Sequence, residues 1–361
     1  MGTPEPRKRQ RTTGDLSNIE TFIRLTNQLN DALCQRRYVV RLTGISFRSL
    51  LLCVASLLAS SLACAQPASV VGIVEGGATL IRQTTRFALA EGVALNEQDI
   101  IETAPGAFVQ IELPGGVLVG LGESTRLMLR PRVGKGLAPP PLYLLQGWLK
   151  TGASGAFAYA SPSFEIATQA ATTVVYTMGA QYEVFLESGA AKLTLRDGAR
   201  TVAQLASGDF AQRREGATPT VARRAAPEFL AKVPRQFRDR LPARAEQFAK
   251  RSVAPKAIGE VAYTDVAAWL RTEPALRLQL LPLWKARAAD LTFRAGAKAD
   301  LAQHPEWEPY ADPEGYARRI AEEAERRRAR EAARQAARQA ARAAAAAAAA
   351  SDTSGGSAKP Q

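Results

Sequence analysis

The chain has 361 residues, of which 46% are hydrophobic, and a formal net charge of +13. It contains one histidine, His304, and three cysteines, Cys34, Cys53 and Cys64. From residue 66 onward there is thus no cysteine and a single imidazole, which excludes disulfide bonds, catalytic thiolates and a His/Cys metal site there. The positive charge favours an anionic partner.

Residues 49–66, with the sequence SLLLCVASLLASSLACAQ, favour a cleaved signal peptide over a membrane anchor. The apolar region, residues 50–65, is shorter than the roughly 20 residues that a spanning helix needs. Arginines precede it, and Ala63 and Ala65 give the small-x-small pattern of a cleavage site directly before Gln66. We expect residues 1–65 to be an N-terminal extension plus signal peptide, and the protein to be periplasmic or secreted. Acylation of Cys64 and retention as a single-pass inner-membrane anchor remain alternatives.

Residues 69–214 alternate apolar and polar side chains in strand-length runs that glycine-rich turns separate. Phe108, Gln110 and Glu112 alternate with apolar residues, and the Pro-Gly-Gly of 114–116 is a turn before the next run. Further turns are expected at 76–77, 188–189, 197–198 and 207–208. The pattern predicts ten or more short strands and no helix, and so an antiparallel all-β sandwich or roll. Trp148 is expected to lie in the core or on a sheet face.

Five short motifs in this region resemble those of the FecR-like domain, which is found in the periplasmic halves of envelope signal transducers. They are Gln98–Thr103, Leu113–Val117, Ser124–Leu127, Leu144–Gly147 and Gly179–Val184. The sequence departs from that pattern at Gln98, Pro114, Ala180 and Tyr182, where the family has Gly, Asp, Thr and Phe. The resemblance covers about two fifths of the chain and implies a FecR-like β domain at 69–214. Because the motifs are mostly turn and core positions, it implies the fold more than an activity.

Residues 227–313 change to helical spacing and predict a small helical domain. Phe229, Val233 and Phe237 lie four apart, with Leu241 and Phe248 extending that face. Thr264 and Thr272 are expected to cap two further helices, and Pro282 to bend or end the second. The expected core comprises Trp269, Leu276, Leu280, Trp284, Leu291 and Phe293. His304 is expected to cap or pack, and the charged residues 235–240 to form a solvated face or a docking surface on the β domain.

Residues 314–361 form an Ala/Arg-rich tail that is expected to be helical and then disordered. Its arginines recur every four residues, so on a helix they make a slowly winding stripe. The stripe comprises Arg326, Arg330, Arg334, Arg338 and Arg342. Either it is a solvated face, or it contacts an anionic envelope surface.

No nucleophile–base pair, metal cluster or carboxylate pair can be placed by spacing, so we expect no enzyme and no cofactor. The first hypothesis is a non-enzymatic, periplasmic binding module whose partner is an envelope protein or an anionic envelope polymer, and not nucleic acid. The alternative is a single-span FecR-type regulator that relays an envelope signal to a sigma factor. The sequence identifies neither the ligand nor the oligomeric state.

Overall fold

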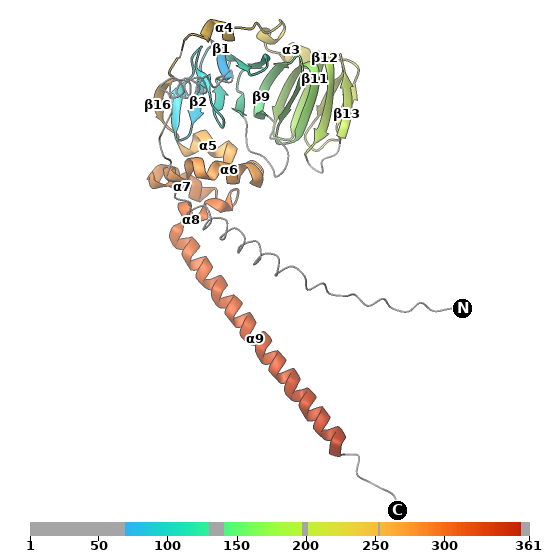
Figure 1. Cartoon of the computed structure of the whole chain (residues 1–361), viewed down its shortest axis with the longest axis vertical. Coiled ribbons are helices and arrows are strands. Elements are labelled where there is room, and N and C mark those ends of the chain that lie inside the picture. The colour runs from blue at the N-terminus through green and yellow to red at the C-terminus, as the bar shows by residue number, and fades with distance from the viewer. Residues whose placement is uncertain (1–68, 130–140, 197–200, 252, 355–361) are drawn as a thin grey trace, which may run out of the picture. The chain divides into compact units, whose positions relative to one another are not determined.

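The computed structural model describes residues 69–129, 141–196, 201–251 and 253–354, which belong to one compact unit, Gln66–Gln361. The expected signal peptide, its cleavage residues Ala63, Ala65 and Gln66, and the turn at 197–198 lie outside the described residues. The predicted fold class is confirmed: a large, mostly antiparallel sheet is followed by helices (Figure 1). Among the described residues, no helix is long and apolar enough to span a membrane.

The described strands belong to one continuous sheet, whose main path runs β15-β14-β12-β11-β10-β9-β8-β5-β2-β3-β16, with β1, β4, β6, β7 and β13 off that path. Their bounds are β1 (Ser69–Glu75), β2 (Ala78–Arg82), β3 (Thr85–Ala88), β4 (Ala94–Leu95), β5 (Ile100–Thr103), β6 (Phe108–Leu113), β7 (Val117–Leu121), β8 (Arg126–Leu129), β9 (Leu142–Gly152), β10 (Ala156–Ala160), β11 (Phe164–Met178), β12 (Gln181–Leu195), β13 (Thr201–Ala206), β14 (Phe210–Arg213), β15 (Thr220–Ala222) and β16 (Lys256–Glu260).

The turn expected at 188–189 is wrong, whereas those at 76–77, 114–116 and 207–208 are confirmed. Ser188 and Gly189 lie inside β12, where the register with β11 shifts at a β-bulge. Gly189 has φ +83°, and a Cβ there would meet the carbonyl oxygen of Ala170 at 2.2 Å. The glycine therefore marks a bulge that lets two 15-residue strands continue past it.

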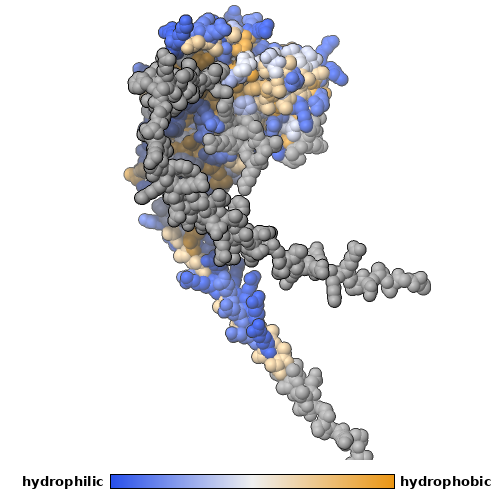
Figure 2. Space-filling view, in the orientation of Figure 1, coloured by the Kyte–Doolittle hydropathy of each residue, from blue (hydrophilic) through white to orange (hydrophobic). Residues whose placement is uncertain are grey.

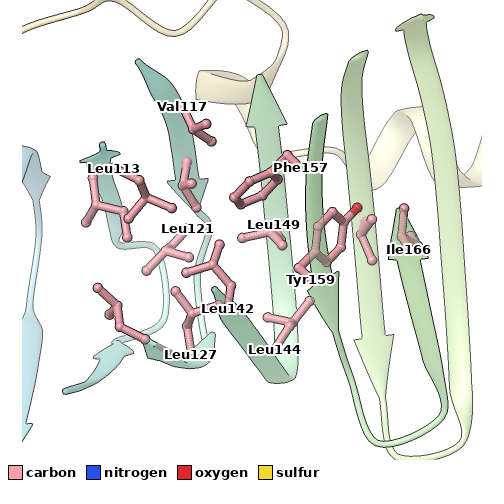
Figure 3. Close-up of a cluster of buried hydrophobic side chains, with 14 of the residues drawn as sticks. Leu113, Val117, Leu121, Leu127, Leu142, Leu144, Leu149, Phe157, Tyr159 and Ile166 are labelled. Carbon is pink, nitrogen blue, oxygen red and sulfur yellow. The ribbon is translucent and has the colours of Figure 1, made fainter. Parts of the chain in front are cut away.

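Several strands are buried on both faces, because successive residues are apolar rather than alternating with polar ones. On β9, Leu144 and Leu149 belong to an inner core with Leu121, Tyr159 and Ile166, whose side chains lie together in Figure 3. Their neighbours Tyr143, Leu145 and Trp148 are buried on the opposite side. The outer faces of the sheet therefore need covers of their own.

The C-terminal helices cover one outer face. They are α5 (Tyr263–Leu270), α6 (Pro274–Trp284), η2 (Lys285–Ala289), α7 (Leu291–Ala299), η3 (Pro305–Trp307) and α8 (Glu308–Ala311). The helix-side core joins strand residues Ile81, Ile100, Met128 and Tyr143 to helix residues Val266, Trp269, Leu270, Leu276, Leu280, Trp284, Phe293 and Trp307. Alternating residues of one strand thus serve two cores.

Three expectations for these helices are wrong. Leu291 is 70% exposed, because it is the first residue of α7 while Phe293 two positions on faces the core. Thr264 lies inside α5, whose N-cap is Ala262, with Asp265 accepting the Ala262 N–H at 2.8 Å. Thr272 does not cap α6 either; its hydroxyl donates to the Trp269 carbonyl at the end of α5. Pro282 lies inside α6, which ends two residues later.

The helix face expected across Phe229 to Phe248 is also wrong. The chain there forms three short pieces, α3 (Pro227–Lys232), η1 (Arg235–Phe237) and α4 (Ala245–Phe248). Residues 227–244, here called the strap, cross the other outer face of the sheet, so that Figure 1 shows strands between α3 and α4 on one side and α5 to α7 on the other. The strap-side core comprises Phe108, Trp148, Val174, Phe210, Phe229, Phe237 and Leu241.

The strap also explains why all six residues of β6 are buried, although the sequence alternates polar and apolar there. Gln110 donates from Nε2 to the Pro242 carbonyl, and Glu112 accepts the backbone N–H of Arg244. Polar side chains expected on an open face thus bind the backbone of the strap. At one end of the main path of the sheet, β16 pairs with β3. The strap, which precedes residue 250, and β16, which follows it, therefore both pack on the β region.

Candidate functional site

The motif residues that resemble the FecR-like pattern fix turns of the sheet. Asp99 is 1% exposed and accepts two hydrogen bonds from the guanidinium of Arg82, at 2.9 Å from Nε and 2.6 Å from Nη2. It also accepts the N–H of Asn96 at 2.7 Å, and Arg82 reaches the carbonyl of Ala94. One carboxylate thereby closes the turn before β5 and ties it to β2.

The same turn occurs again before β14. Asp209 accepts the N–H of Ala206 at 2.8 Å, three residues back, just as Asp99 does with Asn96. Its guanidinium partner, Arg223, is 88% exposed and makes one contact at 3.3 Å. The preceding residues, Gln98 with φ +67° and Gly208 with φ +90°, are both left-handed. This geometry explains why the FecR-like pattern has glycine at the position of Gln98.

A second motif contact joins Gly147 to Thr125. Gly147 has φ +96°, and a Cβ there would lie 2.5 Å from the backbone of Thr125. The Thr125 hydroxyl accepts the N–H of Trp148, while the Thr103 hydroxyl donates to the carbonyl of Gly122 and accepts the Thr125 N–H. These buried hydroxyls satisfy backbone groups at a register shift between β8 and β9, so their role is structural.

Lys150 lies under the strap, at the base of a cleft of about 460 Å³. Its side chain is 4% exposed, and its ammonium contacts Glu187 at 2.9 Å and donates to the carbonyls of Phe237 at 2.6 Å and Asp239 at 3.3 Å. These partners occupy all three donors of the ammonium, so Lys150 holds the strap to β9. The side chains of Arg238 and Arg240 line the cleft and are exposed. The charged 235–240 segment therefore docks through the buried Phe237 ring and the carbonyls of Phe237 and Asp239, while these arginines stay solvated.

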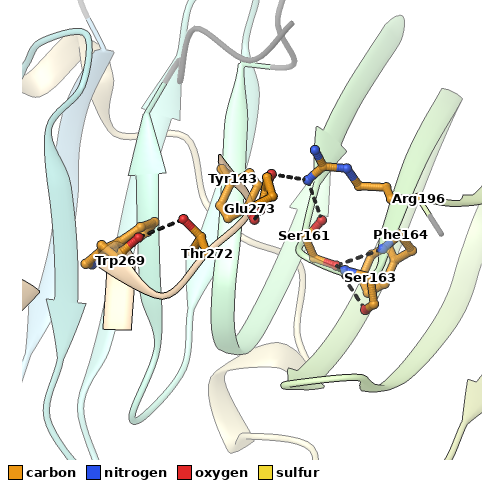
Figure 4. Close-up of polar contacts among 8 residues, drawn as sticks. All are labelled: Tyr143, Ser161, Ser163, Phe164, Arg196, Trp269, Thr272 and Glu273. Atoms are coloured by element: carbon orange, nitrogen blue, oxygen red, sulfur yellow. Dashed lines mark hydrogen bonds and ion pairs between the residues drawn. The ribbon is translucent and has the colours of Figure 1, made fainter. Parts of the chain in front are cut away.

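A polar bridge joins the sheet to α6 (Figure 4). Tyr143 on β9 donates to Glu273 at 2.6 Å, and Glu273 pairs with Arg196 at 2.7 Å. The Arg196 guanidinium also donates to the Ser161 carbonyl at 2.9 Å and lies 5.6 Å from the centre of the Tyr143 ring. Burial and the adjacent Glu273 carboxylate raise the pKa of Tyr143 well above its usual range, so the phenol remains a hydrogen-bond donor.

His304 packs inside the helical part, as expected, and is fully buried. Tyr263 donates to Asp300 at 2.7 Å, and the Tyr263 oxygen lies 2.9 Å from His304 Nε2. Because the phenol proton goes to Asp300, Nε2 of the imidazole is the donor in that contact. The Nδ1 atom is buried without a hydrogen-bond partner in the described structure. Burial lowers the pKa of His304 and favours the neutral ring.

The predicted arginine stripe lies on α9 (Pro313–Ser354), which is one continuous helix in Figure 1. All five stripe residues, Arg326, Arg330, Arg334, Arg338 and Arg342, are exposed. Arg326 has an acidic neighbour in Glu322, 4.0 Å away, and no ion pair is found for the other four among the described side chains. Among all the residues that the structure describes, no cluster of three or more His, Cys, Asp or Glu residues could bind a metal ion.

Comparison with known proteins gives few matches. No family model matches the chain, and no curated protein matches it. Two solved structures, both described as a "putative anti-sigma factor" from Parabacteroides distasonis, resemble it at 14% and 13% identity, with TM-scores of 0.30 and 0.31. Each match covers 37% of this chain, which spans about three fifths of the length of those structures (63% and 62%). At these TM-scores the resemblance carries no argument about function.

Proposed function

We propose that this protein is a non-enzymatic binding module of the bacterial cell envelope that holds an anionic envelope partner through the arginine stripe of α9. The observation that carries the proposal is the exposed row of five arginines on a continuous helix, four of them without an ion pair among the described side chains. A solvated helix that served only as a spacer would need no such excess of one sign of charge.

Three buried or half-buried charged groups of the described structure serve the fold. Asp99, Lys150 and Glu273 each bind groups of the protein itself, and each joins two segments of the fold. A general acid or base needs instead a free position from which a substrate can exchange a proton. The hydrogen bonds and ion pairs of these three residues thus stabilise the fold.

The sequence of residues 49–66 predicts export, and an exported protein would meet the anionic components of the envelope. The N-terminal residue of the protein recovered from cells tests this directly. Residue Gln66, free or cyclised, in a soluble periplasmic fraction is the expected result. An intact N-terminus in the inner membrane would contradict export and favour the alternative, a single-span FecR-type regulator that relays a signal to a sigma factor.

The binding test removes charge without removing the helix. Each basic residue near an anionic surface contributes up to about 1 kcal/mol at low salt, so five can contribute a few kcal/mol. Replacing the five stripe arginines by glutamine keeps strong helix formers, and replacing them by lysine keeps the charge. We expect the glutamine variant to lose binding to envelope preparations and its salt dependence, the lysine variant to retain most of both, and all three proteins to melt at the same temperature. Equal binding by the glutamine variant would refute the proposed function.

A further inference from the structure

The stripe does not run straight along α9. A four-residue step rises about 6 Å and turns about 40° on an α-helix, so from Arg326 to Arg342 the arginines advance about 24 Å and rotate through about 160°. The described helix is uninterrupted over these residues. The cationic groups therefore follow a shallow right-handed spiral around it.

Two more arginines lie beside the start of this spiral, on other sides of the helix. Arg327 and Arg328 are exposed and lie about 100° and 200° around the helix from Arg326. Between residues 326 and 342 the chain has seven arginines and one acidic residue, Glu331. Figure 2 shows hydrophilic side chains gathered along this part of α9.

A flat surface contacts a spiral stripe unevenly. A helix with its side chains has a radius of about 5–6 Å, so groups turned about 80° from the line of contact lie about 5 Å further from a plane than the central ones. If Arg334 faces a plane, Arg326 and Arg342 are the two groups lifted away. Guanidinium groups bind phosphate through short, bidentate hydrogen bonds, so these two arginines reach the plane only by turning their long side chains toward it, at a cost in side-chain entropy.

A membrane would also find no apolar anchor on this helix segment. Between residues 326 and 342 every residue other than the arginines, Glu331 and the two glutamines Gln335 and Gln339 is alanine. The last larger apolar residue, Ile320, precedes the stripe and is 42% exposed. Interfacial helices bind bilayers largely through buried Trp, Phe or Leu, so insertion contributes little here.

We propose that the occupant of the stripe is a flexible linear polymer of the cell envelope that carries phosphate groups along its backbone. Such a chain can wind with the spiral and meet all five stripe arginines, and the planar guanidinium fork is suited to phosphate. This inference rests on the proposed function and specifies its ligand. A phosphate-bearing bilayer is the competing occupant, and the experiment below separates the two.

A straightened variant of the same composition tests the spiral. It exchanges three arginines with nearby alanines, so that five arginines lie within about 80° of the helix circumference instead of 160°. Net charge, helix propensity and the number of arginines are unchanged. The exchanges are Arg334→Ala with Ala333→Arg, Arg338→Ala with Ala337→Arg, and Arg342→Ala with Ala340→Arg.

Binding of the full chain is measured to inorganic polyphosphate and to vesicles of equal parts phosphatidylglycerol and phosphatidylcholine, at equal phosphate concentration and low salt. We expect the wild-type chain to bind polyphosphate more tightly than the vesicles. Straightening should raise vesicle affinity about tenfold, because about two more arginines reach the plane, and leave polyphosphate affinity within about twofold. Circular dichroism controls for helix content.

Tighter binding of the wild-type chain to vesicles, or no gain on straightening, would overturn the phosphate-polymer proposal while leaving an anionic partner in place. Failure to bind either probe, together with no effect of the five glutamine substitutions on envelope binding, would instead refute the proposed function itself.

Discussion

Removing the charge of Asp99 should destabilise the protein far more than removing that of Asp209. The two turns are built alike, but Asp99 is 1% exposed and accepts two bonds from Arg82, which is itself only 24% exposed. The partner of Asp209, Arg223, is 88% exposed and touches it once. Asparagine preserves the shape of either side chain and its bond to the turn N–H, so each substitution isolates the ion pair.

The magnitudes follow from burial. Hydrogen bonds to charged groups contribute about 1.5–3 kcal/mol, against about 0.5–1.5 for neutral ones, and a solvent-exposed pair contributes about 0–1. Asp99→Asn also leaves the Arg82 charge without its carboxylate inside the fold. We expect Asp99→Asn to lower the free energy of unfolding by about 2 kcal/mol, and Asp209→Asn by less than about 0.5 kcal/mol.

Urea and thermal denaturation of the full chain, followed by circular dichroism, measure both losses. A double-mutant cycle assigns the cause: once Arg82→Gln is present, Asp99→Asn should cost much less than it does alone. Equal losses at Asp99 and Asp209, or additive effects of the Arg82 and Asp99 changes, would show that the turn itself, and not the buried ion pair, carries the stability.

Three further predictions concern the covers of the sheet and its tight contacts. Phe229→Ala should cost about 3–5 kcal/mol, because this buried ring packs on Trp148 and Phe210, whereas Leu230→Ala, at a side chain 48% exposed, should cost little in the same denaturation assay. Gly147→Ala should abolish the soluble, folded fraction on expression, because its Cβ would lie 2.5 Å from the Thr125 backbone at a left-handed φ. Stability should fall as the pH drops below about 6.5, by up to about 1.4 kcal/mol per unit, because the lowered pKa of His304 makes the unfolded chain bind the proton first. The raised pKa values of Glu102 and Glu183 act with the opposite sign, so the measurement is the difference between wild type and His304→Gln at each pH, and a pH-independent difference would contradict it.

The sequence predicted the strands because their information is local. Period-two spacing, together with the glycines at 76–77 and 115–116, places most turns without reference to distant residues. The error at Gly189 has the same origin. A glycine with positive φ serves equally in a turn and in a bulge, and only the partner strand, through the carbonyl of Ala170, distinguishes them.

What the sequence did not predict depends on contacts between distant residues. Lys150 is an ordinary polar position of a strand until the strap, nearly ninety residues later, places the carbonyls of Phe237 and Asp239 beside it. Gln110 is buried for the same reason. One signal was present: β9 contains too many consecutive apolar residues for a strand with one open face. That run indicates a cover without saying which segment supplies it.

The two covers restrict where a partner can bind. Apolar outer faces of a sheet are common sites of protein association, but here the strap and the helices α5 to α7 bury them with the chain's own Phe229, Phe237, Trp269 and Trp284. A partner could use those faces only by displacing groups that cost several kcal/mol to remove. The arginines of α9 require no such displacement, since their side chains are already exposed. Binding through α9 should therefore leave the stability of the body unchanged, apart from mass action, whereas binding at a sheet face would expose the strap to protease.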